Sequence, residues 1–130
     1  MARTVVADVM TRQVVFLPGE TTLDEAAQVM RDQGIGDVVV TQGPTMAGMV
    51  TDRDIVIRAI AENLPPDTTT LESIATREII MVEQTATVEE AVQAMRERGV
   101  RRLLVCDADR KLVGIISLSD LALLQTSAPA

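Results

Sequence analysis

The sequence contains no histidine, tryptophan or tyrosine, and it has one phenylalanine and one cysteine, Cys106. The absence of histidine removes the commonest general base and the commonest metal ligand. A single cysteine cannot form an internal disulfide. Cys106 lies in an apolar strand pattern with no histidine to activate it, which favours a buried structural thiol over a nucleophile. The composition therefore argues against an enzyme.

The hydrophobic residues make up 47% of the chain and are almost all aliphatic, because aromatic residues contribute 1%. At 130 residues the chain can form one compact domain, or two small halves that share a core. The first residues lack the continuous apolar segment of a signal peptide, and no apolar run is long enough to cross a bilayer. The sequence therefore predicts a cytoplasmic protein with no membrane partner.

The net charge is −7 and the isoelectric point is about 4.5. A surface with this charge repels the phosphate backbone, so nucleic acid is not an expected partner. Small anionic ligands remain compatible with the sequence, because a local group of arginines and backbone N–H groups can outweigh a distant net charge.

The chain contains an internal repeat. The segment TLDEAAQVMRDQG from Thr22 matches TVEEAVQAMRERG from Thr87, 65 positions later. Further along, GMVTDRD from Gly48 matches GIISLSD from Gly114 at an offset of 66, which places one extra residue in a loop. Two copies of one structural unit are therefore expected.

Each copy predicts a short helix or turn, a strand, a helix, two strands and a closing helix. The long helices should begin at Thr22 and Thr87, each followed three residues later by Glu in a capping box, and end at Gly34 and Gly99. The expected boundaries are residues 6–63 for the first repeat, 64–70 for a Pro-containing linker, 71–125 for the second repeat and 126–130 for a flexible tail. The closing helices are expected from Asp52 to about Asn63 and from Leu118 to about Gln125.

These features together resemble a pair of CBS domains, the regulatory module named after cystathionine β-synthase. The resemblance rests on DVMT near the start, the two helix-then-glycine segments, and the doubled G-h-h-[ST]-x-x-D pattern, where h is apolar. The run TDRDIVIRAIAEN is similar to small stand-alone bacterial CBS pairs. The resemblance implies an α/β fold of the α+β type: two β-α-β-β-α repeats related by pseudo-twofold symmetry and packed sheet to sheet.

Thr51 with Asp54, and Ser117 with Asp120, form the two hydroxyl–acid motifs of the repeats. In both, the hydroxyl residue is placed to cap a helix, with the acid three residues later. The CBS resemblance implies a second role, in which the acid binds two ribose hydroxyls and the hydroxyl residue approaches phosphate. A carboxylate can accept both hydrogen bonds of a vicinal diol. We expect the motifs to cap their helices and also to bind ligand.

The two expected clefts between the repeats differ in charge. Arg101 and Arg102 precede a strand near the second motif, and Arg77 begins its own repeat. The matching part of the first repeat contains Asp37, and Asp52 adds another negative charge. Phosphate should therefore prefer the cleft with Ser117 and Asp120, although a solvated pair is the alternative for Arg101 and Arg102.

Two apolar residues are candidates for contact with adenine. The first strands are predicted as VVFL from Val14 and IIMV from Ile79, and the resemblance places adenine at the starts of these strands. The alternative is that both residues are part of a strand core.

The resulting hypothesis is a regulatory sensor that binds an adenine nucleotide or related ligand: AMP, ATP or S-adenosylmethionine. No cofactor or metal is expected. The CBS resemblance implies a homodimer, and an unidentified protein partner would read the conformational change. The alternative hypothesis is a ligand-free dimeric interaction scaffold with the same fold.

Overall fold

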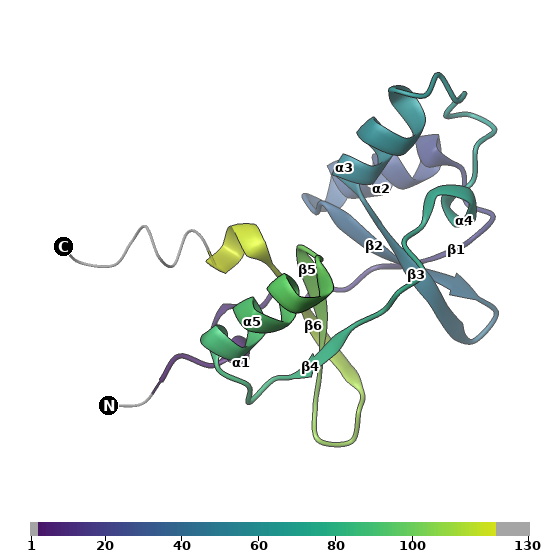
Figure 1. Cartoon of the computed structure of the whole chain (residues 1–130). Helices are drawn as coiled ribbons and strands as arrows, with labels where there is room; N and C mark the ends of the chain where they lie inside the picture. The colour runs from purple at the N-terminus through teal and green to yellow at the C-terminus, as the bar shows by residue number, and fades with distance from the viewer. Residues whose placement is uncertain (1–2, 122–130) are drawn as a thin grey trace. The chain divides into compact units, whose positions relative to one another are not determined.

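The computed structural model describes residues 3–121 and divides them into two compact units (Figure 1). The first-sheet unit contains residues 15–79. The second-sheet unit contains residues 3–14 together with 80–121. Each unit has one three-stranded sheet, so the mixed fold class with two similar repeats is confirmed.

In the first-sheet unit the strand order is β1-β2-β3, with β1 parallel to β2 and β2 antiparallel to β3. The strands are β1 (Phe16–Pro18), β2 (Asp37–Gln42) and β3 (Thr45–Thr51). The helices are α2 (Leu23–Gln33), α3 (Asp52–Asp54), the π-helix η1 (Ile55–Ile60) and α4 (Leu71–Ile74).

The second-sheet unit repeats this pattern in the order β4-β5-β6. Its strands are β4 (Met81–Glu83), β5 (Arg102–Cys106) and β6 (Leu112–Ser117), and its helices are α1 (Val6–Val9) and α5 (Val88–Arg98). Residues 118–121 are helical. The rest of the closing helix predicted from Leu118, and the predicted tail 126–130, lie outside the described residues.

The helix ends predicted from sequence are confirmed. Thr22 and Thr87 cap α2 and α5, and in each case the Glu three residues later completes a capping box. Gly34 and Gly99 end these helices with φ values of 65° and 66°. Such left-handed conformations are strained for residues with a Cβ, which explains glycine at both positions.

Aliphatic side chains fill both cores, as the composition predicted. Inner strands β2 and β5 are each buried over at least three successive residues. They pack against the inward faces of α2 and α5, where Met30 and Met95 are buried. Ala27, beside the buried Ala26 on α2, is exposed. Cys106 is buried at the end of β5, in agreement with the prediction of a structural thiol.

The repeats exchange their first helices. Helix α1 belongs to the first repeat in sequence but packs in the second-sheet unit, where Val6 is fully buried and Thr11 forms a bridge with Ile115. Helix α4, at the start of the second repeat, packs in the first-sheet unit, where Leu71 is fully buried. Sequence repeats and compact units therefore have different boundaries.

The closing helix of the first repeat differs from a regular α-helix. After one turn it continues as η1, with bonds of 2.9 Å from the Ala61 N–H to the Val56 carbonyl and 3.0 Å from the Leu64 N–H to the Ala59 carbonyl. Three β-branched residues, Ile55 to Ile57, lie in this segment. Such side chains crowd the preceding turn of an α-helix, and a wider π turn relieves that crowding.

Candidate ligand-binding site

The first hydroxyl–acid motif joins the end of β3 to the start of α3. The Asp54 N–H donates to the Thr51 hydroxyl oxygen at 3.0 Å, and the Thr51 N–H donates to Asp54 Oδ2 at 2.9 Å. Both residues are half-buried. Thr51 has an extended backbone, as N-cap residues usually do. The predicted cap is therefore present.

The second motif has the same reciprocal arrangement at the end of β6. The Asp120 N–H donates to Ser117 Oγ at 3.2 Å, and the Ser117 N–H donates to Asp120 Oδ2 at 3.2 Å. Ser117 Oγ also lies 3.1 Å from Ser119 Oγ. Ser117 is 8% exposed, so its hydroxyl is held in place by its surroundings.

The two predicted arginines of the second repeat lie next to its motif. Arg102 is the register partner of Ser117 across β5 and β6. The Arg101 carbonyl accepts a 2.8 Å hydrogen bond from the Leu118 N–H. In the first-sheet unit the register partner of Thr51 is Asp37. The residue paired with the hydroxyl residue is therefore a cation, Arg102, in one sheet and an anion, Asp37, at the matching position of the other.

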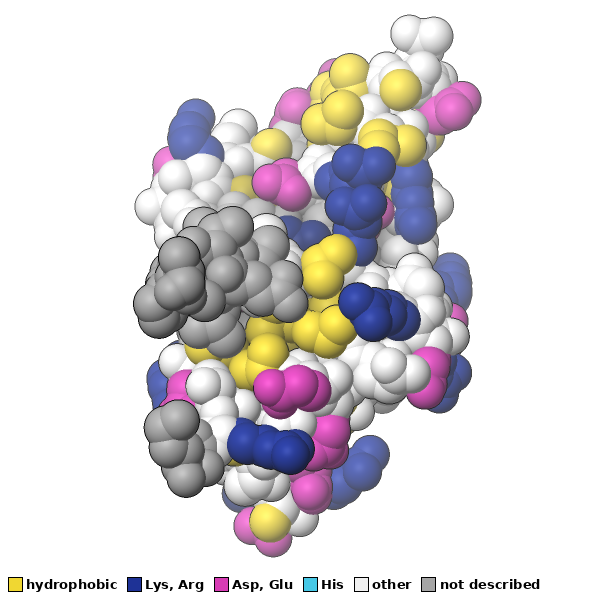
Figure 2. Space-filling model, turned by 60° about the vertical axis from the view of Figure 1, so that its left-hand side comes forward, with side chains coloured by type: hydrophobic (Ala, Val, Ile, Leu, Met, Phe, Trp, Pro, Cys, Tyr) yellow, Lys and Arg dark blue, Asp and Glu magenta, His cyan; other side chains and the backbone are white. Residues whose placement is uncertain are grey.

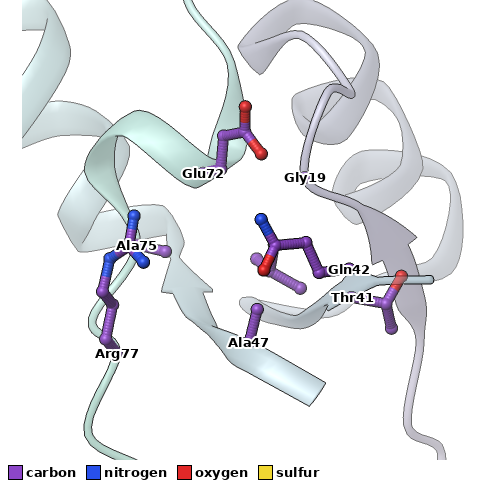
Figure 3. A pocket seen from close by; sticks show the side chains of 8 residues that line it. Gly19, Thr41, Gln42, Ala47, Glu72, Ala75 and Arg77 are labelled. Carbon is purple, nitrogen blue, oxygen red and sulfur yellow. The ribbon is translucent and has the colours of Figure 1, made fainter. Parts of the chain in front are cut away.

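Arg77 belongs to the second repeat in sequence but lies in the first-sheet unit. Within that unit it is distant from the motif formed by Thr51 and Asp54. It is exposed and lines a pocket of about 10 Å³, enough for a single water molecule. Figure 3 shows the side chains of Gln42, Glu72 and Arg77 around this pocket. Gln42 is at the hairpin end of β2, whereas Thr51 is at the opposite end of β3.

Val14 and Ile79 precede the strands that they were predicted to begin. Strand β1 starts at Phe16 and β4 at Met81, and both candidate residues are half-buried. The parallel pairing still extends toward them, because the Val15 carbonyl accepts from the Val39 N–H at 2.9 Å. The error arises because apolar sequence alone does not locate where pairing with β2 or β5 begins.

Comparison with known proteins identifies the family. The family model described as CBS domain matches residues 6–60 and 71–126. The chain belongs to the CBS domain family. It is 37% identical over 120 residues to Hypoxic response protein 1 of Mycobacterium tuberculosis, covering 92% of this chain and 83% of that protein. It is 36% identical over 117 residues to MK0525 of Methanopyrus kandleri, covering 89% of this chain and 60% of that longer protein.

Solved CBS structures have the same fold. A protein with CBS domains from Burkholderia ambifaria is 27% identical, with a TM-score of 0.82 and 98% coverage of both chains. The CBS pair of MJ0100, in complex with 5-methylthioadenosine and S-adenosyl-L-methionine, is 23% identical, with a TM-score of 0.79 and coverage of 96% and 98%. Like these proteins, the chain is a CBS pair, and CBS pairs are regulatory modules.

The crystal structure of Hypoxic response protein 1 contains two coordinated zinc ions. In this CBS pair, no group of three or more His, Cys, Asp or Glu side chains among residues 3–121 could hold a metal ion. Within the same described residues, no helix is long and apolar enough to cross a membrane.

A groove that the sequence did not predict lies beside the second motif. It has a volume of about 400 Å³, within the usual range for small-molecule sites. Its lining includes Arg101 and Leu118, the latter within the motif, together with the buried apolar residues Met95 and Leu121. The available signal was the apolar residues of α5, two of which line the groove.

A second missed feature is Arg58, whose Nε lies 3.7 Å from Asp54 Oδ1. Asp120 has no ion-pair partner among the described residues. The two acids therefore make the same cap but have different electrostatic surroundings.

Proposed function

We propose that this CBS pair is a regulatory sensor that binds an adenine nucleotide or related adenosyl ligand at the second motif. The observation that carries the proposal is the grouping of Ser117, Asp120, Arg101 and Arg102 at one end of a single sheet. The Asp120 carboxylate supplies acceptors for a vicinal diol, and the arginines supply positive charge for phosphate.

Support for an adenosyl ligand comes from the MJ0100 pair, which was crystallised with two adenosyl compounds. AMP, ATP and S-adenosylmethionine are the candidates. At 23% identity, that structure is evidence for the fold of the chain and not for its ligand. It serves here to select the ligands to be tested. The assignments of Val14, Ile79 and Arg77 as ligand contacts stay predictions from the sequence.

Regulation requires that the ligand favour one conformation over another. A ligand with equal affinity for both states shifts no equilibrium, however tightly it binds. We propose that a protein partner reads the difference and that the chain has no catalytic activity of its own. The absence of histidine is consistent with this assignment.

A ligand-free scaffold is the second candidate function. It is favoured by the capping boxes, in which each acid already accepts a hydrogen bond from its own repeat. Exposed apolar side chains on and just after η1 also favour association; they are Val56, Ile57, Ile60 and Leu64. Several hydrophobic side chains are visible on the face shown in Figure 2. A homodimer is proposed under both functions.

Equilibrium dialysis distinguishes the two functions. The protein lacks Trp and Tyr, so nucleotide retained on the protein side is measured directly by the absorbance of adenine. The sensor proposal predicts retention of AMP or ATP that is lost in Asp120→Ala and kept in Asp54→Ala. Retention of none of the three candidate ligands, or equal retention by wild type and Asp120→Ala, would contradict it.

A further inference from the structure

Arg58 connects the first motif to a different helix. Its Nη1 donates a 2.9 Å hydrogen bond to the carbonyl of Ile74, the last residue of α4. Its Nε faces Asp54 Oδ1 at 3.7 Å, beyond hydrogen-bond length but within ion-pair range. The Asp54 side chain is 18% exposed and that of Arg58 is 46% exposed. The guanidinium is thus held from two sides.

In this arrangement each oxygen of the Asp54 carboxylate already has a neighbour that attracts it. Oδ2 accepts the Thr51 N–H, and Oδ1 faces the Arg58 cation. A vicinal diol needs carboxylate oxygens that can accept two further hydrogen bonds. A ribose bound at Asp54 would compete with the Arg58 guanidinium for this carboxylate, and binding both hydroxyls at Oδ1 and Oδ2 would weaken the ion pair.

The second motif lacks this cation. Asp120 Oδ2 accepts the Ser117 N–H, and no arginine or lysine among residues 3–121 lies within ion-pair distance of the carboxylate. In the sequence, the offset of 66 that matches Asp54 with Asp120 matches Arg58 with Leu124. A leucine side chain cannot pair with a carboxylate.

We infer that Arg58 is a specificity-determining residue that closes the first motif to ribose and leaves the second motif as the binding site. The inference rests on the proposed function and explains why one of two nearly identical motifs binds. The expected difference is about tenfold in affinity, comparable to one hydrogen bond to a charged group. Removing Arg58 should therefore create binding at Asp54, an effect that loss of a merely structural contact would not produce.

The test uses the full chain with Asp120→Ala, so that the second motif no longer contributes. AMP binding is measured by equilibrium dialysis over a range of concentrations. Arg58→Leu reproduces the residue of the second repeat, and Arg58→Gln removes the charge while keeping a donor for the Ile74 carbonyl. Arg31→Leu is the matched control, because it removes an exposed arginine of the same unit from α2. Circular dichroism confirms that each variant is folded.

The inference predicts that both Arg58 variants bind AMP about tenfold more tightly than Asp120→Ala alone. The gain should disappear when Asp54→Ala is added, and Arg31→Leu should show no gain. Unchanged affinity in both folded Arg58 variants would overturn the inference while leaving the sensor proposal intact. Weaker binding by Arg58→Leu in the wild-type background would also overturn it, because Arg58 would then be a ligand contact. No binding by any form, wild type included, would refute both proposals.

Discussion

Thr51 and Ser117 show how one residue can serve both the fold and a ligand. Each hydroxyl accepts an N–H of the helix that it caps and also carries a proton that it can donate. Substitution by alanine would remove the cap together with any ligand contact, typically at a cost of about 1 kcal/mol. The acids are therefore the better residues for separating binding from stability.

At Glu25 the capping box also affects ionisation. The Thr22 hydroxyl donates to Glu25 Oε1 at 2.8 Å and the Thr22 N–H at 3.2 Å, and these bonds lower the pKa of the Glu25 carboxyl. Because the folded-state pKa lies below the unfolded value, the carboxylate stabilises the fold above the unfolded pKa. This contribution is lost as pH falls through the folded pKa.

Wild type should therefore melt at a higher temperature than Glu25→Gln at neutral pH. The difference should narrow as the pH falls below the ordinary pKa of a glutamate carboxyl. Thermal unfolding at several pH values measures it, and Glu62→Gln, in the turn after η1, is the charge-matched control. A difference that persisted unchanged into strong acid would show that the Glu25 charge is not the cause.

Sequence predicted these caps because they depend on residues three positions apart. Arg58 follows Asp54 by four positions, a spacing that was a usable signal for the ion pair. Its hydrogen bond to the Ile74 carbonyl, sixteen positions away and in the next repeat, could not be predicted from local spacing. Local spacing identifies a cap. It does not identify the distant carbonyl group that holds the Arg58 guanidinium beside the cap.

At the scale of elements, one glycine in each sheet allows the close approach of another chain segment. A Cβ at Gly48 would lie 2.6 Å from the Thr76 carbonyl oxygen, and a Cβ at Gly114 would lie 2.8 Å from the Thr11 carbonyl oxygen. Both segments belong to the exchanged parts of the repeats, and both form bridges with the strand. Glycine at these positions is therefore needed for packing.

Gly48→Ala should destabilise the protein by about 1–3 kcal/mol, because the segment at Thr76 must move away from β3. Urea unfolding followed by circular dichroism measures the free energy change. Gly114→Ala should have an effect of similar size in the other unit. If neither substitution changed stability, the close contact of these segments with the strands would be wrong.

The elements that sequence predicted least well are those without strong local signals. The two strands predicted after each long helix are present, as β2 and β3 in the first-sheet unit and β5 and β6 in the second-sheet unit. Strands β1 and β4 begin two residues later than predicted, because their limits depend on pairing with β2 and β5. The π-helix has no sequence signal beyond its β-branched run.

At the scale of the whole molecule, the sequence repeat did not predict that α1 and α4 each pack in the unit formed mainly by the other repeat. The repeat establishes that two similar units exist, whereas their composition depends on which core each short helix joins. Val6 and Leu71 are both apolar and could be buried in either core. The hydrophobic pattern alone therefore does not show which core each residue joins. Backbone hydrogen bonds show which unit each short helix belongs to. One example is the 2.9 Å bond from the Leu71 N–H to the Thr21 carbonyl.

The proposed homodimer can be tested at the exposed apolar residues of η1. Ile57 and Ile60 are 46% and 51% exposed, and replacing both with Asp should shift the protein from dimer to monomer. Size-exclusion chromatography with light scattering measures the mass. Gln28→Asp, at an exposed position of α2, is the control and should remain dimeric. A variant that stays dimeric would exclude this surface from the interface.

The most direct test of the central claim is the number of nucleotides that one wild-type chain binds at saturation. Equilibrium dialysis against AMP and ATP in turn gives this number from the excess adenine absorbance. We predict one nucleotide per chain, bound at Ser117 and Asp120. Two per chain would mean that the first motif is open despite Arg58. None, with S-adenosylmethionine also unbound, would contradict the sensor function and leave both motifs as helix caps.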